Sequence, residues 1–95
     1  MEIRFTRNAY ADVDAIYDYI AADNPAMAQK ILNKIENMID YLADHPQLGR
    51  IGKVIGTREL IVPDTPYIIA YKIDQQVIDI LAIIHSKTRW PEQFD

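Results

Sequence analysis

The sequence contains no cysteine, and among its 95 residues it has only three glycines, two histidines and one tryptophan. Without cysteine there is no disulfide, no thiolate zinc site and no cysteine nucleophile. Two histidines, His45 and His85, are too few for a metal site unless carboxylates supply most of the ligands. We therefore expect no metal and no small-molecule cofactor.

Long apolar runs are also absent. No stretch approaches the roughly 18–20 apolar residues that cross a bilayer, so we expect no membrane association. The opening residues, MEIRFTRNAY, lack the apolar core of a secretory signal. These two absences lead us to expect a cytoplasmic protein.

Positive charge is not in excess, since ten Lys and Arg residues stand against fourteen Asp and Glu, a net charge of −4. Residues 1–47 hold four basic and eight acidic side chains, whereas residues 48–95 balance at six and six. An acidic domain lacks the general attraction to phosphate backbones that supports non-specific nucleic-acid binding. Length and the apolar share of 49% indicate one globular domain over residues 1–95.

The first half of the chain predicts a strand and then a helix. Residues 2–6 alternate polar and apolar side chains, which is typical of a half-buried strand. Apolar side chains then recur at steps of three and four through residues 9–20, with Asn8 as the expected helix cap. The acidic residues of this segment leave the apolar stripe and are interpreted as a solvated helix face: Asp12, Asp14 and Asp18.

A second helix is expected directly after the first. Asn24 is a suitable cap and Pro25 suits the first helical position. An apolar stripe continues to Leu42, and Pro46 places the end of the helix near residues 44–45. Because the connection is short, the two helices form an antiparallel hairpin.

The second half predicts a small sheet. All three glycines lie within residues 49–56, at a spacing that excludes a Walker phosphate loop. Strands are expected over residues 58–62, 67–73 and 77–85, and the last two form a hairpin. The order is β-α-α-β-β-β, an α+β fold with an N-terminal helical hairpin packed on one face of a small antiparallel sheet.

Strict alternation divides the last expected strand into two faces. One face holds Ile78, Ile80, Ala82 and Ile84, and is expected to meet the helices. The other holds Val77, Asp79, Leu81, Ile83 and His85, which is too apolar for full exposure to water and suggests a partner.

The ordered segments of this chain resemble those of the RelE/ParE family of bacterial toxins from type II toxin–antitoxin modules. The resemblance rests on "DVDAIYDYIAADNPAMAQKILNKIE", "HPQLGR", "GTREL", "YIIAYKI" and "VIDILAIIHSKTRWP", which follow one another as they do in that family. It implies a toxin that arrests bacterial growth and a cognate antitoxin that neutralises it. RelE-like members cleave messenger RNA on the ribosome, whereas ParE-like members poison DNA gyrase.

The RelE branch implies basic and tyrosyl side chains that this chain largely lacks. Ile68 stands where the RelE pattern has a catalytic arginine, and Phe94 stands near the expected tyrosine. If the chain is an mRNA endonuclease, its catalytic group is expected to gather at one end of the sheet, with His85 as general base: Arg58, Tyr71, His85, Lys87 and Arg89.

Structural roles compete with each of these catalytic roles. His85 could cap a backbone carbonyl at the end of its strand, and Tyr71 could be an aromatic at the edge of the core. Arg58 could pair with Glu59 or with a nearby helix carboxylate. The enzyme reading is therefore the less favoured one.

The ParE-like reading requires a protein–protein contact, which an acidic domain tolerates. Inhibition of DNA gyrase is the favoured function, and the alternatives are a ribosome-dependent mRNA endonuclease and a non-toxic relative that binds an antitoxin. The candidates for target binding are Arg50, Lys53, Arg58, Lys87, Arg89 and Trp90. The candidates for antitoxin binding are Tyr17, Ile20, Leu81 and Ile83.

Overall fold

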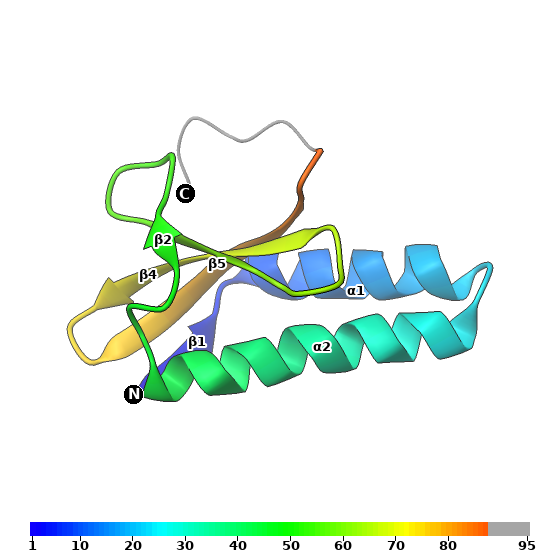
Figure 1. Cartoon of the computed structure of the whole chain (residues 1–95), viewed down its shortest axis with the longest axis horizontal. Helices are drawn as coiled ribbons and strands as arrows, with labels where there is room; N and C mark the ends of the chain where they lie inside the picture. Colours follow the sequence, from blue (N-terminus) through cyan, green and yellow to red (C-terminus); the bar gives the residue numbers. More distant parts are fainter. Residues whose placement is uncertain (88–95) are drawn as a thin grey trace.

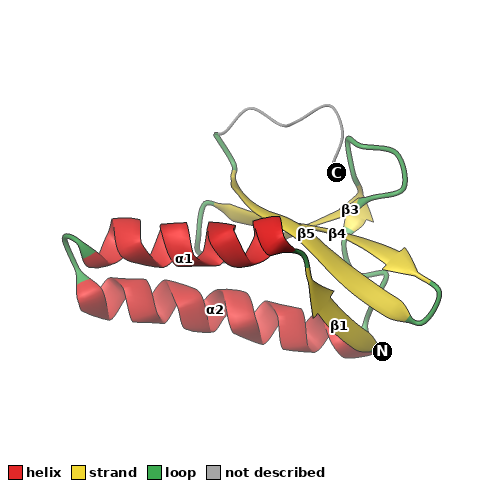
Figure 2. Ribbon diagram, turned by 180° about the vertical axis from the view of Figure 1, so that it is seen from behind, coloured by secondary structure: helices red, strands yellow, loops and turns green. Residues whose placement is uncertain are grey.

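Two antiparallel helices cover one face of a five-stranded sheet in the computed structural model, which describes residues 1–87 (Figure 1). The elements are β1 (Glu2–Phe5), α1 (Arg7–Ala21), α2 (Pro25–Asp44), β2 (Arg50–Ile51), β3 (Arg58–Ile61), β4 (Tyr67–Asp74) and β5 (Val77–His85). Figure 2 shows both helices on the same side of the strands. The predicted α+β class and the helical hairpin are confirmed. Neither helix is long and apolar enough to cross a membrane.

The caps explain where the helices begin and end. The hydroxyl of Thr6 accepts the N–H of Ala9 at 3.1 Å, so Thr6 caps α1 and the predicted cap, Asn8, is wrong. Asn8 lies inside the first turn because the backbone of Thr6 is still extended. The expected start of α2 is confirmed, since Asn24 accepts the N–H of Met27 and a proline follows it.

The sheet has the strand order β1-β5-β4-β3-β2. Its β3, β4 and β5 pair antiparallel as predicted, but β1 pairs parallel to β5, so the sheet is mixed. Strand β2 was not predicted, because two residues are too few to show an alternating pattern. It pairs antiparallel with β3 and forms one edge of the sheet.

A β-bulge in β5 overturns the predicted division of its faces. Ala70 pairs with Ala82 and Tyr71 pairs with Ile80, so Leu81 is an extra residue with no partner on β4. An extra residue reverses the alternation beyond it. Ile83 therefore lies on the helix side, and Ala82 does not.

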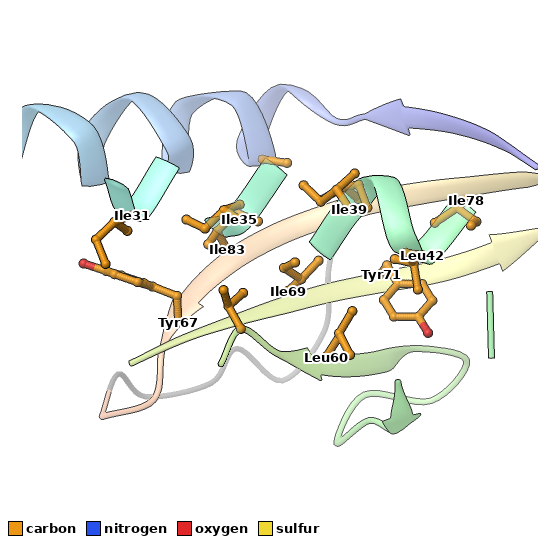
Figure 3. Close-up of a cluster of buried hydrophobic side chains, with 13 residues drawn as sticks. Ile31, Ile35, Ile39, Leu42, Leu60, Tyr67, Ile69, Tyr71, Ile78 and Ile83 are labelled. Carbon is orange, nitrogen blue, oxygen red and sulfur yellow. The ribbon is translucent and has the colours of Figure 1, made fainter. Parts of the chain in front are cut away.

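The core lies between the helices and the inner face of the sheet. Figure 3 shows Ile35 and Ile39 of α2 above Ile69 and Ile83 of the strands. The buried cluster draws on both layers: Ala9, Ile31, Ile35, Ile39, Leu42, Leu60, Val62, Tyr67, Ile69, Tyr71, Ile78, Ile80 and Ile83. A second, small cluster of Ala70, Ala82 and Ile84 lies on the opposite face.

Ile80 is the last residue of β5 that pairs with β1. Beyond it, two side chains at or near the start of α1 form hydrogen bonds with the backbone of β5. The hydroxyl of Thr6 donates to the carbonyl of Leu81 at 3.1 Å, and the carboxylate of Asp12 accepts the N–H of Ile83 at 3.0 Å. The interpretation of Asp12 as part of a solvated face is therefore wrong. Burial raises the pKa of Asp12, and the N–H of Ile83 offsets part of that rise.

Candidate functional site

The segment between α2 and β2 is fastened to the sheet by Tyr71. The tyrosine is fully buried, and its hydroxyl accepts the N–H of Gly49 at 2.9 Å and donates to the carbonyl of Pro46 at 2.7 Å. A Cβ atom on residue 49 would lie 2.7 Å from the ring, so only glycine fits there. Burial raises the pKa of Tyr71, while the N–H of Gly49 and the charge of Arg58 oppose that rise. The hydroxyl is thus engaged inside the protein.

Arg58 also supports this segment. Its guanidinium donates to the carbonyls of Gly49 at 2.7 Å and Gln47 at 3.4 Å. The expected ion pair between Arg58 and Glu59 is wrong, because the two side chains lie on opposite faces of β3 and Glu59 pairs with Arg50 instead.

Glu59 is a buried carboxylate, 3% exposed, that organises the turn from β2 to β3. It accepts the backbone N–H of Lys53 at 2.7 Å and the guanidinium of Arg50 at 3.3 Å. Burial of a charge is costly unless the charge is paired and hydrogen-bonded, and here it is both. Three of the predicted target-binding residues, Arg50, Lys53 and Arg58, are therefore held in one folded unit.

The tip of this unit, residues 51–56, carries two exposed isoleucines. Ile55 is 100% exposed and Ile51 is 76% exposed. Ile51 also lines a hollow of about 400 Å³ beside the tip, together with residues such as Arg58 and Ile73. Figure 1 shows the tip projecting from the sheet on the side away from the helices.

His85 lies elsewhere on the sheet. Its ring packs edge-on against Tyr67 with centroids 5.5 Å apart, and its Nδ1 accepts the backbone N–H of Lys87 at 3.1 Å. The ring thus caps a backbone group, as the structural interpretation anticipated, although the group is an N–H and not a carbonyl. Lys87 is exposed and lies two residues after the end of β5.

Among the described residues of the predicted catalytic group, Arg58 and Tyr71 lie together and His85 lies apart from them. Arg58 pairs with Tyr71 on β4, whereas His85 pairs with Tyr67. Four residues along a strand separate these two positions by roughly 13 Å, at about 3.3 Å per residue. Arg89 and Trp90 lie outside the described residues. Within residues 1–87 no three His, Asp or Glu side chains are placed to hold a metal ion.

A groove runs between the two helices and contains one of the predicted antitoxin-binding residues. It encloses about 340 Å³ and is lined by Val13, Asp14, Tyr17, Asp18, Gln29 and Leu32. Ile20, a second candidate, packs partly buried against the main core.

The other two antitoxin candidates are buried. Leu81 and Ile83 are each 5% exposed, and Ile83 faces the helices because of the bulge. The expectation that Ile83 lies on an open sheet face is wrong.

Sequence reasoning missed Glu59 and the two isoleucines of the tip. Ile51 and Ile55 stand between glycines, in a segment too short for helical or strand periodicity. That placement was the signal of exposure that the sequence offered, because an apolar side chain in a glycine-rich turn has few core residues to pack against. Nothing in the local sequence marked Glu59 as buried.

Comparisons with known proteins agree with this architecture. Residues 3–90 match the model of the family described as the ParE toxin of the type II toxin–antitoxin system parDE. A Sinorhizobium fredii protein provisionally named as toxin Y4kP is 40% identical over 95% of this chain and 93% of its own length. Toxin RelE2 of Caulobacter vibrioides is 32% identical over 90% of this chain and 94% of its own length.

A solved structure supports the same assignment. A chain of the chromosomal ParDE toxin–antitoxin system from P. aeruginosa is similar with a TM-score of 0.81 and 31% identity, covering 90% of this chain and 95% of that one. Because the family model covers nearly the whole sequence and the fold agrees, this chain belongs to the ParE toxin family of type II toxin–antitoxin systems.

Proposed function

We propose that this ParE-family toxin arrests bacterial growth by binding DNA gyrase, and that it acts through contact with the enzyme and not through hydrolysis. A toxin of this family has a cognate antitoxin as its partner. What we propose beyond the family is the target, DNA gyrase. The main support for action without hydrolysis is the placement of Tyr71. Its hydroxyl is buried and bonded on both sides, so it is not placed to act on a substrate.

The arrangement of the other candidates supports the same choice. Cleavage of RNA would need a base, an acid and charge stabilisation around one phosphate. The guanidinium of Arg58 is bonded to two carbonyls, and His85 lies roughly 13 Å further along the sheet. The net charge of −4 adds no general attraction to RNA.

The antitoxin is proposed to dock on the helical hairpin. The groove between the two helices offers the side chains of Val13, Tyr17 and Leu32 for apolar contact, beside a polar lining of Asp14, Asp18 and Gln29. An amphipathic helix that lays its apolar face into such a groove is a common mode of recognition. The target surface, on the unit that holds Arg50, Lys53 and Arg58, then stays on the other side of the molecule.

The test combines two assays. Purified toxin is added to purified gyrase and relaxed plasmid, and messages from induced cells are mapped by primer extension. We expect supercoiling to be inhibited and messages to stay intact. Cuts within codons on translating ribosomes, with normal supercoiling, would support the mRNA endonuclease instead. Unaffected growth after induction without the antitoxin would leave only the non-toxic relative.

A further inference from the structure

The tip between β2 and β3 exposes aliphatic side chains where a soluble surface normally carries polar ones. Ile55 is 100% exposed and Ile51 is 76% exposed. Each leaves in water an apolar side chain whose burial would be favourable. Single exposed apolar residues are ordinary, but here one turn carries two, four residues apart, and both are available for contact with a partner.

The same turn is tightly held by its own hydrogen bonds. The N–H of Gly52 donates to the carbonyl of Thr57 at 2.9 Å, and both the N–H and the hydroxyl of Thr57 donate to the carbonyl of Val54, at 3.1 and 2.6 Å. Gly56 adopts a φ of +83°, which other residues rarely do. The carboxylate of Glu59 fixes the turn from below through the N–H of Lys53. A partner therefore meets a surface that is already ordered, which lowers the entropy cost of binding.

The neighbouring arginines are bonded within the protein, although the side chain of Arg50 is 61% exposed. Arg50 donates to Glu59, and Arg58 donates to the carbonyls of Gln47 and Gly49. Arg50 bonds the carboxylate that holds the turn, and Arg58 holds the segment before β2, whereas Ile55 in the turn is fully exposed. Aliphatic contact, and not a set of ion pairs, is the larger source of binding energy that this surface offers.

We infer that Ile55 and Ile51 are the anchor by which the toxin grips its protein target, an inference that rests on the proposed function and specifies its contact surface. The partner surface is a pocket on the target protein that has an apolar floor and an acidic rim. The floor receives the two isoleucines. The acidic rim follows from the charge of residues 50–59, where three cationic side chains stand against one carboxylate and Arg50, although bonded to Glu59, stays 61% exposed.

The occupant is the target and not the antitoxin because of where the tip lies. The groove proposed for the antitoxin is lined by α1 and α2, whereas the tip projects from the sheet on the side away from both helices (Figures 1 and 2).

The test replaces the anchors one at a time, as Ile55→Asn and Ile51→Asn. Ile61→Asn is the matched control, since Ile61 is an isoleucine of the same sheet that is 52% exposed and lies outside the tip. Ile55→Leu, which keeps an aliphatic side chain, is the conservative variant. The measurements are growth arrest on induction, inhibition of purified gyrase, antitoxin affinity and the melting midpoint.

We expect Ile55→Asn to reduce both growth arrest and gyrase inhibition at least about tenfold, the loss typical of a central interface residue. Antitoxin affinity and melting midpoint should stay unchanged, because the side chain is fully exposed. Ile51→Asn should reduce the same two activities, whereas Ile61→Asn and Ile55→Leu should preserve them.

Two results would overturn the inference. One is full activity of both Ile55→Asn and Ile51→Asn; the other is a loss of antitoxin affinity with target inhibition preserved. The proposal of gyrase fails separately, if the unaltered toxin stops growth without inhibiting gyrase. In that case a loss of growth arrest in Ile55→Asn still supports the anchor, because growth reports on whichever protein is bound.

Discussion

At the scale of single residues, buried polar groups explain why the candidate site has its shape. The hydroxyl of Tyr71 and the guanidinium of Arg58 together bond the backbone of residues 46–49, so the chain leaves α2 in one fixed direction. Both residue types also occur in catalytic sites. Here their polar atoms are bonded to the backbone, which favours a structural role.

Replacing Tyr71 by Phe should destabilise the fold while preserving growth arrest. The change leaves the N–H of Gly49 without its partner in a buried site, which costs about 1–3 kcal/mol. Urea denaturation measures the loss, and Tyr19→Phe is the control because Tyr19 is 80% exposed. Abolished toxicity with unchanged stability would instead assign the hydroxyl to catalysis.

Replacing His85 by Ala should have little effect on toxicity. The variant loses an edge-on contact with Tyr67, worth about 0.5–1.5 kcal/mol, and one hydrogen bond to the backbone of Lys87. The same replacement at His45, whose ring stacks on Tyr41 with centroids 4.2 Å apart, is the matched control. A colony-count assay after induction distinguishes a structural role of His85 from a catalytic one, since a general base would be needed for any killing by RNA cleavage.

At the scale of elements, side chains at or near the start of α1 form hydrogen bonds with the backbone of β5 at and just beyond its bulge. Beyond residue 80 the edge of β5 has no pairing with β1, and Thr6 and Asp12 bond its carbonyl at Leu81 and its N–H at Ile83. Unpaired backbone groups at a buried edge would cost free energy and invite the addition of a foreign strand. Helix α1 thus closes the sheet edge with its side chains.

The charge of Asp12 should make this closure sensitive to pH. Because burial raises the pKa of Asp12 in the folded state, the native chain holds its proton more tightly than the unfolded chain does. Stability then falls as pH rises from about 4, the ordinary value for Asp, through the folded pKa. Asp12→Asn keeps an acceptor for the N–H of Ile83 and removes the charge, so it should gain stability relative to the natural protein across that interval.

Denaturation of both proteins at several pH values measures this difference, in which the contributions of the other carboxylates cancel. Asp12→Ala is the companion variant. It should be less stable than Asp12→Asn throughout, because it leaves the N–H of Ile83 unpaired. A difference that shrinks as pH rises would show that the carboxylate is favoured in its charged form.

At the scale of the whole molecule, one core joins the two layers. The main buried cluster includes Ile35 and Ile39 of α2 and Ile69, Ile80 and Ile83 of the sheet (Figure 3). Because neither layer can bury its apolar face without the other, the domain should unfold in one step.

Ile35→Ala tests this coupling. The side chain is 1% exposed at the centre of the interface, so its truncation should cost about 2–5 kcal/mol. Far-UV circular dichroism, which reports the helices, and the near-UV signal of the tyrosines should shift together. Separate transitions for the two signals would mean that the layers unfold independently. Lys30→Ala, at an exposed position of the same helix, should leave both transitions in place.

The sequence alone determined both helices, four of the five strands and the class of the fold. These features depend on local interactions: the apolar period of a helix, the alternation of a strand, and the constraints that Asn24, Pro25 and Pro46 place on their own backbone. The family resemblance also followed from the order of such segments, and the comparison with known toxins confirmed it.

Tertiary structure alone decided which residues face which neighbour. One extra residue at Leu81 turns Ile83 into the core, and no local pattern reveals a bulge that depends on pairing with β4. The inward direction of Arg58 and the burial of Glu59 likewise depend on partners distant in the sequence or across a turn. The sequence gives the chemistry of each side chain, but contacts between segments set its exposure. Only the folded molecule therefore shows that Arg58 supports the backbone and that Ile55 is exposed.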